Sequence, residues 1–428
     1  MTDLAKPRYT GEFTPKLATI FAEGYGFREL RADAVAGLTV AIVALPLSMG
    51  IAIASGVSPE RGLYSAIVGG FLVSALGGSR FQVGGPAGAF IVLVAATGAQ
   101  HGIDGLLLAT MLSGLLLTIG GLLRLGSLIR HVPHAVTVGF TAAIAVVITA
   151  SQLRDLAGLR LSGPEPGALA PKLVVLAQAL PTANLVALGL GAGCIAVALA
   201  VRRWRPAWPA LLIGVVLATL AAVLLHLDVE TIGSRFGGIP SGLLMPQLPI
   251  VTLAKVLDIL PAAAAFTLLG GIESLLSATV ADGMSGRRHR SNIELVAQGV
   301  ANMGAALFGG ISVTGTIART ATNVRAGAKG PVAGMLHSLI LLGFMMLAAP
   351  LAAYVPLSAL AGMLVVVGWN MAERAEFARL LRVSWRTALV LLATFGLTLA
   401  RDLITGISAG CLLAALFAGE ARLRTRRA

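Results

Sequence analysis

Residues 309–323 read GGISVTGTIARTATN, a β-branched, Gly-rich stretch that changes into a short helix carrying Arg319. Residues 80–96, RFQVGGPAGAFIVLVAA, repeat this pattern: an extended stretch, a Gly/Pro break and then an apolar helix. Non-helical backbone at membrane depth is tolerated only where it lines a cavity. We therefore predict two half-helices that begin near the centre of a membrane and face a central site.

The composition of the whole chain supports a membrane protein. Its 428 residues are 57% hydrophobic and only 12% charged, and apolar runs such as residues 106–123, LLLATMLSGLLLTIGGLL, recur along its length. This pattern predicts an all-α, polytopic membrane protein with about 14 transmembrane segments. The sequence contains no Ser/His/Asp, metal-binding or nucleotide-binding signature, so we expect that the protein is not an enzyme and binds no cofactor. Cys194 and Cys411 lie in apolar segments without CxxC spacing and are interpreted as core residues.

The basic residues predict the orientation of the chain. The net charge is +13, but the cations gather in short turns and in the tail, so the positive-inside rule explains them without nucleic acid. The first thirty residues lack the continuous apolar core of a signal peptide. We expect both termini in the cytoplasm of a bacterium, with the chain in the inner (plasma) membrane. The predicted parts are a cytoplasmic segment (1–33), a first repeat (34–226), an external loop region (227–256), a second repeat (257–418) and a basic tail (419–428).

The two interrupted segments lie at comparable positions in the two halves of the chain, roughly 45 residues after the first helix of each half. Paired interrupted helices predict an inverted repeat with the substrate site at its interface. The half-helices would begin at residues 85–88 and 315–318, where free N–H groups and helix dipoles favour an anion. Thr316 could donate a hydroxyl hydrogen bond, and Arg319 adds a full positive charge. An ionisable group at membrane depth indicates a functional site.

Glu273 lies mid-span within residues 270–278, GGIESLLSA. Three roles are open for this carboxylate. It could bind the coupling proton, help to coordinate Na+ with Ser277 one turn away, or simply neutralise Arg319.

Three stretches resemble one family, the SulP anion transporters, which are bacterial relatives of the animal sulfate/anion exchangers. They are residues 44–70, ALPLSMGIAIASGVSPERGLYSAIVGG, residues 79–90, SRFQVGGPAGAF, and residues 314–334, TGTIARTATNVRAGAKGPVAG. The resemblance covers about residues 33–402. It implies two inverted seven-segment repeats, as in uracil permease, and a core domain that moves against a gate domain like an elevator.

The resemblance also implies the site residues. The anion site of the family falls on the starts of the third and tenth helices, here Ala87, Gly88, Gly315, Thr316 and Ile317. The coupling position falls on Glu273, with Ser277 as its neighbour.

Three departures from the family pattern change these expectations. Bicarbonate-transporting members that use Na+ have Asp where this chain has Glu273, and Thr where it has Ser277 and Ala87, so H+ is favoured over Na+ as the coupling ion. Many members have Gln where this chain has Leu47, so one substrate contact is expected to be missing. The family usually carries a cytoplasmic STAS domain, and the sequence predicts a membrane domain without it.

The leading hypothesis is a secondary active transporter of a small inorganic oxyanion, sulfate or bicarbonate, embedded in the lipid bilayer. The alternatives are a C4-dicarboxylate transporter of the same family, a nucleobase:cation symporter of the same fold, and an anion channel or exchanger. A nucleobase symporter calls for acidic side chains on helices eight and ten. Only Glu273 is available here, and Arg319 also argues against that function. The identity of the anion, the choice between H+ coupling, Na+ coupling and exchange, the stoichiometry and the formation of a homodimer are left open. It is also left open whether a STAS domain is naturally absent or was removed.

Overall fold

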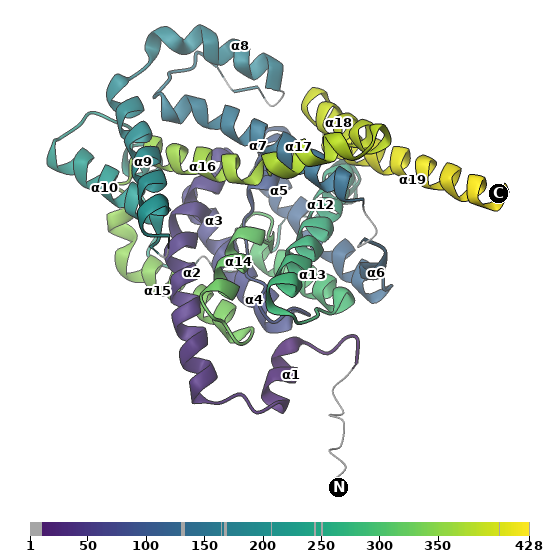
Figure 1. Cartoon of the computed structure of the whole chain (residues 1–428). Helices are drawn as coiled ribbons and strands as arrows, with labels where there is room; N and C mark the ends of the chain where they lie inside the picture. Colours follow the sequence, from purple (N-terminus) through teal and green to yellow (C-terminus); the bar gives the residue numbers. More distant parts are fainter. Residues whose placement is uncertain are drawn as a thin grey trace. The chain divides into compact units, whose positions relative to one another are not determined.

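The computed structural model describes residues 11–129, 133–163, 165–166, 169–206, 208–243, 245–249, 251–401 and 403–427. The chain is predominantly helical, as predicted (Figure 1). It divides into two compact units, each built from two separate stretches. The first unit holds residues 1–130 and 232–354, and the second holds residues 131–231 and 355–428. The predicted repeats (34–226 and 257–418) and loop region (227–256) stay predictions; residues 1–10 of the predicted N-terminal segment and residue 428 of the tail lie outside the described residues.

The first unit combines long apolar helices with two short breaks. Its elements are α1 (Lys16–Ala22), α2 (Phe27–Ala54), α3 (Pro59–Tyr64), a π-helical turn (Ser65–Gly69), α4 (Gly70–Leu76), β1 (Gly84–Gly85), a 3₁₀ turn (Gly88–Phe90), α5 (Ile91–Leu122), α6 (Gly126–Ile129), α11 (Ile232–Phe236), α12 (Leu253–Ser285), α13 (Ser291–Leu307), β2 (Thr314–Gly315), α14 (Ile317–Arg325) and α15 (Val332–Ala352).

The helices of the first unit pack through glycine. A Cβ atom on Gly114 of α5 would lie 2.6 Å from the carbonyl oxygen of Gly299 on α13, and one on Gly37 of α2 would lie 2.6 Å from that of Ala333 on α15. Small residues let helix backbones approach closely in a membrane, where lipid tails supply no hydrophobic drive for association. Glycine therefore permits the close packing of α5 on α13 and of α2 on α15.

The named elements of the second unit are all helices, and its described residues add one isolated β-bridge between Thr231 and Pro356. Its elements are α7 (His134–Leu156), α8 (Leu169–Ala179), a 3₁₀ turn (Leu180–Thr182), α9 (Leu185–Trp204), α10 (Ala210–Leu224), α16 (Leu357–Met371), α17 (Arg374–Val383), α18 (Trp385–Ala400) and α19 (Leu403–Arg427). Two of these helices are not foreseen by the sequence pattern. α8 is a short helix of 11 residues, and α17 occupies a basic stretch of the kind expected as a short turn.

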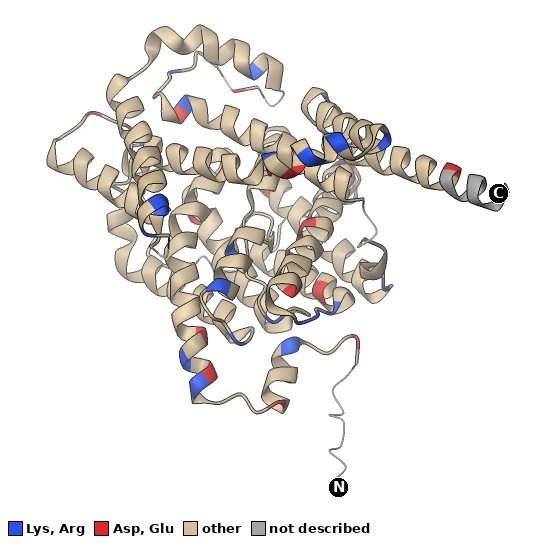
Figure 2. Ribbon diagram, in the orientation of Figure 1, with Lys and Arg blue, Asp and Glu red and all other residues tan. Residues whose placement is uncertain are grey.

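Six described helices are long and apolar enough to cross a membrane. They are α2, the segment 88–122 that ends with α5, α7, α9, α12 and α15. Four shorter apolar helices accompany them, at residues 169–182, 210–224, 385–400 and 405–420. Figure 2 shows long stretches of these helices without a charged residue, in keeping with the low charge content of the chain.

Candidate functional site

The two breaks pair with each other inside the first unit. β1 and β2 are antiparallel, with Gly84 opposite Gly315 and Gly85 opposite Thr314. All four residues are buried. Both breaks are predicted correctly, but their pairing is not, because two-residue strands carry no periodic pattern. The pairing brings together two helix starts that are about 230 residues apart in the chain.

The first half-helix begins where the sequence predicts. Ala87 is extended (φ −118°, ψ 147°) and precedes the 3₁₀ turn at Gly88, which continues into α5. α5 is itself kinked at Gly102, whose φ of 68° only glycine adopts readily. The kink therefore separates a short half-helix from the part of α5 that contains the apolar run beginning at residue 106. Ala87 is buried, whereas Gly88 is half-buried.

The second half-helix is α14, and Thr316 is its extended N-cap residue (φ −95°, ψ 127°). The backbone N–H of Thr316 donates to the carbonyl of Val83 at 3.2 Å, and its hydroxyl faces the same oxygen at 3.5 Å. The hydroxyl thus already has an acceptor within the protein. Ile317 is half-buried and Ala318 is exposed, so the first turn of α14 reaches the surface of the unit at Ala318.

Arg319 is only 1% exposed. Its guanidinium donates to the carbonyl oxygens of Gly84 (3.5 Å) and Pro86 (3.4 Å) and to Oγ of Ser48 (3.0 Å). The side chain of the second half-helix therefore holds the backbone of the first break. A buried cation needs such partners, because its desolvation is otherwise costly.

Glu273 of α12 does not form an ion pair with Arg319 in the part of the chain that the structure describes. Its Oε2 is buried and has no hydrogen-bond partner among the described residues. The interpretation of Glu273 as a structural counter-ion of Arg319 therefore lacks support from the geometry. The carboxylate is left available for another role.

Ser277, one turn beyond Glu273, joins α12 to the second half-helix. Its hydroxyl donates to Oγ1 of Thr320 at 3.1 Å, and this oxygen accepts the backbone N–H of Val83 at 3.2 Å. The chain of bonds links the predicted coupling helix to both breaks. Ser277 and Thr320 are both buried.

Gln82 lies at the candidate site, although the sequence reasoning did not single it out. Its Nε2 donates to Oγ of Ser274 at 2.7 Å, and its Oε1 is buried without a partner among the described residues. The amide lies so close to Gly315 that a Cβ there would overlap Nε2. A single polar residue within the apolar stretch before the first break is the signal that could have identified it.

Two amides of α13 hold the second break in place. Asn302 accepts the backbone N–H of Val313 at 2.9 Å and donates to its carbonyl at 2.8 Å. Gln298 donates to the same carbonyl. These bonds satisfy backbone groups that no helix pairs, which a buried break requires.

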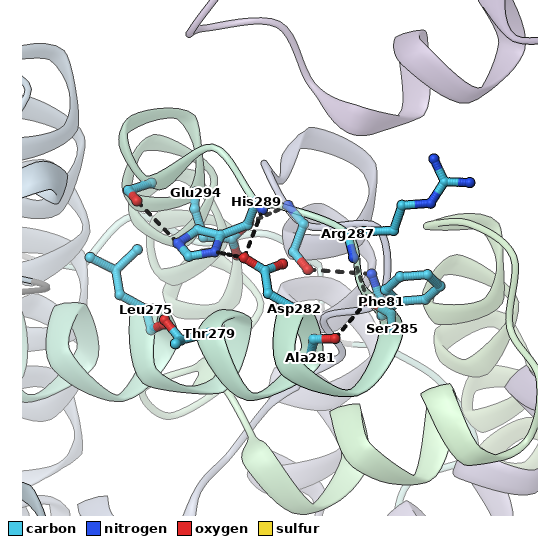
Figure 3. Close-up of polar contacts among 11 residues, drawn as sticks. Phe81, Leu275, Thr279, Ala281, Asp282, Ser285, Arg287, His289 and Glu294 are labelled. Atoms are coloured by element: carbon cyan, nitrogen blue, oxygen red, sulfur yellow. Dashed lines mark hydrogen bonds and ion pairs between the residues drawn. The ribbon is translucent and has the colours of Figure 1, made fainter. Parts of the chain in front are cut away.

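A polar network also closes the turn between α12 and α13 (Figure 3). Asp282 accepts the backbone N–H of His289 at 3.0 Å, and its Oδ2 lies 2.7 Å from Nδ1 of the same ring. Nε2 of His289 lies 3.0 Å from Oγ of Ser291, and Glu294 accepts the N–H of Ser79 at 2.8 Å. The network ties the helix that bears Glu273 to its neighbour.

The chain matches the model of the sulfate permease family over residues 30–394, which is most of its length. The Bacillus subtilis (strain 168) protein YvdB, whose name assigns it provisionally to sulfate transport, is 42% identical over 411 residues, which cover 96% of this chain and 76% of YvdB. The chain belongs to the sulfate permease (SulP) family. The bicarbonate transporter BicA of Synechocystis sp. (strain ATCC 27184 / PCC 6803 / Kazusa) is 32% identical over 400 residues, which cover 91% of this chain and 69% of BicA.

Solved structures confirm the fold of this SulP protein. The transmembrane domain of a cyanobacterial BicA superposes with a TM-score of 0.79 at 29% identity, covering 90% of this chain and 98% of that domain. A murine Solute Carrier 26 family member A9 structure gives a TM-score of 0.85 at 18% identity, covering 97% of this chain and 73% of that chain, and supports the fold alone. The chain is therefore an integral, multi-pass membrane protein, and its relatives are transporters and not enzymes.

Proposed function

We propose that this SulP protein is a secondary active transporter that moves a small inorganic oxyanion of the sulfate or bicarbonate class across the plasma membrane, coupled to H+. One observation carries the proposal: the β1–β2 pairing brings the starts of two half-helices together. The first N–H groups of each helix lack intrahelical acceptors, and both helix dipoles present their positive ends there. An oxyanion accepts hydrogen bonds from such groups, whereas a cation or a neutral base would gain little.

The substrate residues of this proposal are those at the two helix starts. Ala87, Gly88, Gly315 and Ile317 contribute backbone N–H groups and small or extended segments. Thr316, whose own N–H donates to the carbonyl of Val83, is the extended N-cap residue beside them. The guanidinium of Arg319 is bonded to backbone carbonyls of the first break and to Ser48. It therefore contributes positive electrostatic potential to the site without being a direct ligand of the anion. This division makes the backbone responsible for recognition and the arginine responsible for attraction.

Glu273 and its surroundings support coupling to H+. A proton needs only the carboxylate, and Oε2 of Glu273 is buried without a partner among the described residues. Na+, like other hard cations, prefers several oxygen ligands. The hydroxyl of Ser277, the oxygen one turn away, is directed to Thr320. The arrangement therefore favours a site that binds a proton over a site that coordinates Na+.

An elevator mechanism requires that one rigid body carries the whole site. All eight proposed residues, the substrate residues together with Glu273 and Ser277, belong to the first unit. We propose that this unit moves with its bound anion between the two sides of the membrane. A cysteine at exposed Ala318, in a variant without Cys194 and Cys411, should react with a membrane-impermeant thiol reagent added from either side. Reaction from one side only, under every substrate and pH condition, would contradict alternating access.

Uptake by the purified protein in proteoliposomes tests the proposed function. Radiolabelled sulfate and bicarbonate are offered under an imposed H+ or Na+ gradient, with fumarate and uracil as competitors. We expect one of the two oxyanions to accumulate against its gradient only when H+ is supplied. Competition by fumarate or uracil would identify a dicarboxylate or nucleobase transporter, and flux without accumulation would identify a channel or an exchanger.

A further inference from the structure

The second unit contains an apolar cavity of about 530 Å³ that the proposed transport mechanism does not use. Its wall is formed by residues of α7, α8, α16, α17 and α18, and Thr149 and Arg374 are the polar residues among them. The hydroxyl of Thr149 donates to the carbonyl of Ala145 at 2.8 Å, so it needs no further partner. The volume falls within the range of ligand pockets, about 300–1,000 Å³, and the interior suits a hydrocarbon.

The cavity opens beside a helix with the features of a membrane interface. α17, with the sequence RAEFARLLRV, places Phe377 in the cavity wall and buries Leu380, while its arginines alternate with these residues. Trp369 and Trp385 flank the helix and are 57% and 67% exposed. Tryptophan and amphipathic basic helices gather at the boundary between headgroups and acyl chains.

Arg374 lies at the mouth of the cavity, and its positive charge is not paired with a carboxylate of the described residues. Its guanidinium stacks over the ring of Trp369 at 3.6 Å, and it has no carboxylate within 4.0 Å in the described part of the chain. Glu376, on the same helix, is bound by His134 at 2.8 Å and by Nε of Arg379 at 2.7 Å. The cavity therefore combines an apolar interior with one free positive charge at its rim.

We propose that this cavity binds one anionic phospholipid, with an acyl chain among the apolar residues and the phosphate at Arg374. Water is a poor occupant of a cavity with so few polar partners, and an empty cavity of this size forfeits the contacts of its lining. The surrounding bilayer supplies acyl chains. A net negative headgroup is favoured over a zwitterionic one, because a juxtamembrane arginine is attracted to anionic lipid.

Quenching of Trp369 by brominated lipid tests the proposal on the full chain. The protein has four tryptophans, so replacing Trp204, Trp208 and Trp385 by Phe leaves Trp369 as the reporter. In phosphatidylcholine vesicles, acyl-brominated phosphatidylglycerol should quench Trp369 at about fivefold lower mole fraction than acyl-brominated phosphatidylcholine, as expected from the attraction of one arginine to an anionic headgroup. Unbrominated phosphatidylglycerol should relieve the quenching, whereas unbrominated phosphatidylcholine and inorganic phosphate should not.

Matched variants separate the headgroup from the acyl chain. Arg374→Gln should abolish the preference for phosphatidylglycerol, while Arg382→Gln on the same helix should keep it. Val146→Phe, at a cavity residue that is 41% exposed, should weaken quenching by both lipids. Val216→Phe, at a residue that is 44% exposed and lies outside the cavity wall, should not. Equal quenching by the two brominated lipids in the parent, or a preference that survives Arg374→Gln, would overturn the proposal. The lipid competition in the protein with Trp369 as its single tryptophan tests the proposal even if one of the further variants fails to fold.

Discussion

Gly85 lies directly against the side chain of Arg319: a Cβ atom at residue 85 would overlap Nη1 of the guanidinium. The guanidinium reaches the carbonyls of Gly84 and Pro86 only because the residue between them has no side chain. This glycine is required for close approach and not for an unusual φ, since it is absent from the residues with positive φ. The relationship joins the charge of one half-helix to the backbone of the other.

Gly85→Ala is therefore expected to abolish anion binding without changing any charge. The added methyl group must displace the guanidinium or the β1 backbone, and either movement separates the two helix starts. Calorimetric titration of the purified variant with sulfate and bicarbonate measures the loss. Gly98→Ala on α5 is the matched control, because a Cβ there has no atom nearer than 3.9 Å, and it should bind as the wild type does. Wild-type affinity for the anion in Gly85→Ala would show that anion binding does not depend on the position of Arg319.

Glu273→Gln is expected to reduce gradient-driven accumulation to the equilibrium level while anion binding and folding are kept. The substitution removes the titratable group and conserves its size, and Oε2 has no partner among the described residues to lose. Uptake in proteoliposomes between pH 5 and pH 8 measures the effect. Asp104→Asn, at an exposed carboxylate of the same unit, is the control. Accumulation with an unchanged pH dependence in Glu273→Gln would assign coupling to another residue.

Arg319→Ala is expected to weaken the apparent affinity about tenfold, which corresponds to about 1.4 kcal/mol, and to keep the order of selectivity. It should also lower the free energy of unfolding by about 1–3 kcal/mol, because buried acceptors lose their donor. Since Arg319 and Glu273 do not form an ion pair, the double variant with Glu273→Gln should be additive within about 0.5 kcal/mol. Denaturation of both single variants and the double variant measures this coupling; rescue by Glu273→Gln would show an ion pair.

Gly315→Val and Gly88→Leu are each expected to eliminate anion binding, because backbone N–H groups reach an anion only where no side chain intervenes. At Gly315 the overlap is with Nε2 of Gln82. The milder Gly315→Ala should therefore regain part of its affinity when combined with Gln82→Ala. Calorimetry on the folded variants measures both effects. Near-wild-type binding by Gly315→Val would place the anion away from the two helix starts.

Lys16 is expected to destabilise the folded protein at neutral pH. Burial, followed by the nearby charges of Arg290 and Arg80, lowers the pKa of Lys16 from 10.5 to about 8. Between pH 8 and 10.5 the unfolded chain then binds more protons than the folded one, so this contribution to stability rises with pH in that window and is fully unfavourable below pH 8.

Thermal unfolding of wild type and Lys16→Met across this range tests the linkage. The Met variant should melt higher at pH 7, and the difference should shrink towards pH 10.5. The backbone N–H of residue 16, which donates to the carbonyl of Gly77 at 2.9 Å, is kept in both proteins. A difference in melting temperature that does not vary with pH would mean that Lys16 acts through packing alone.

The sequence by itself determined the class of the protein, the recurrence of long apolar segments along the chain and the two breaks that carry the candidate site. Apolar runs of about twenty residues are a length signal that survives in any tertiary context, because the bilayer sets it. The starts near Gly88 and Ile317 were also predictable, since Gly/Pro breaks and β-branched residues act locally. α17 was not predicted, because it is short and its many charged residues make its amphipathic pattern difficult to recognise in the sequence.

Only the tertiary structure decided how the candidate site is assembled. The pairing of Gly84 with Gly315 joins segments about 230 residues apart, and no local pattern encodes such a contact. The partners of Arg319 were likewise hidden. A sequence reader pairs a lone arginine with a lone carboxylate, whereas in the fold its two Nη atoms donate to two backbone carbonyls and to Ser48, and its buried Nε has no partner among the described residues. Backbone oxygens are present at every residue, so only the path of the chain selects which of them meet the guanidinium, and that path leaves Glu273 unpaired in the described structure.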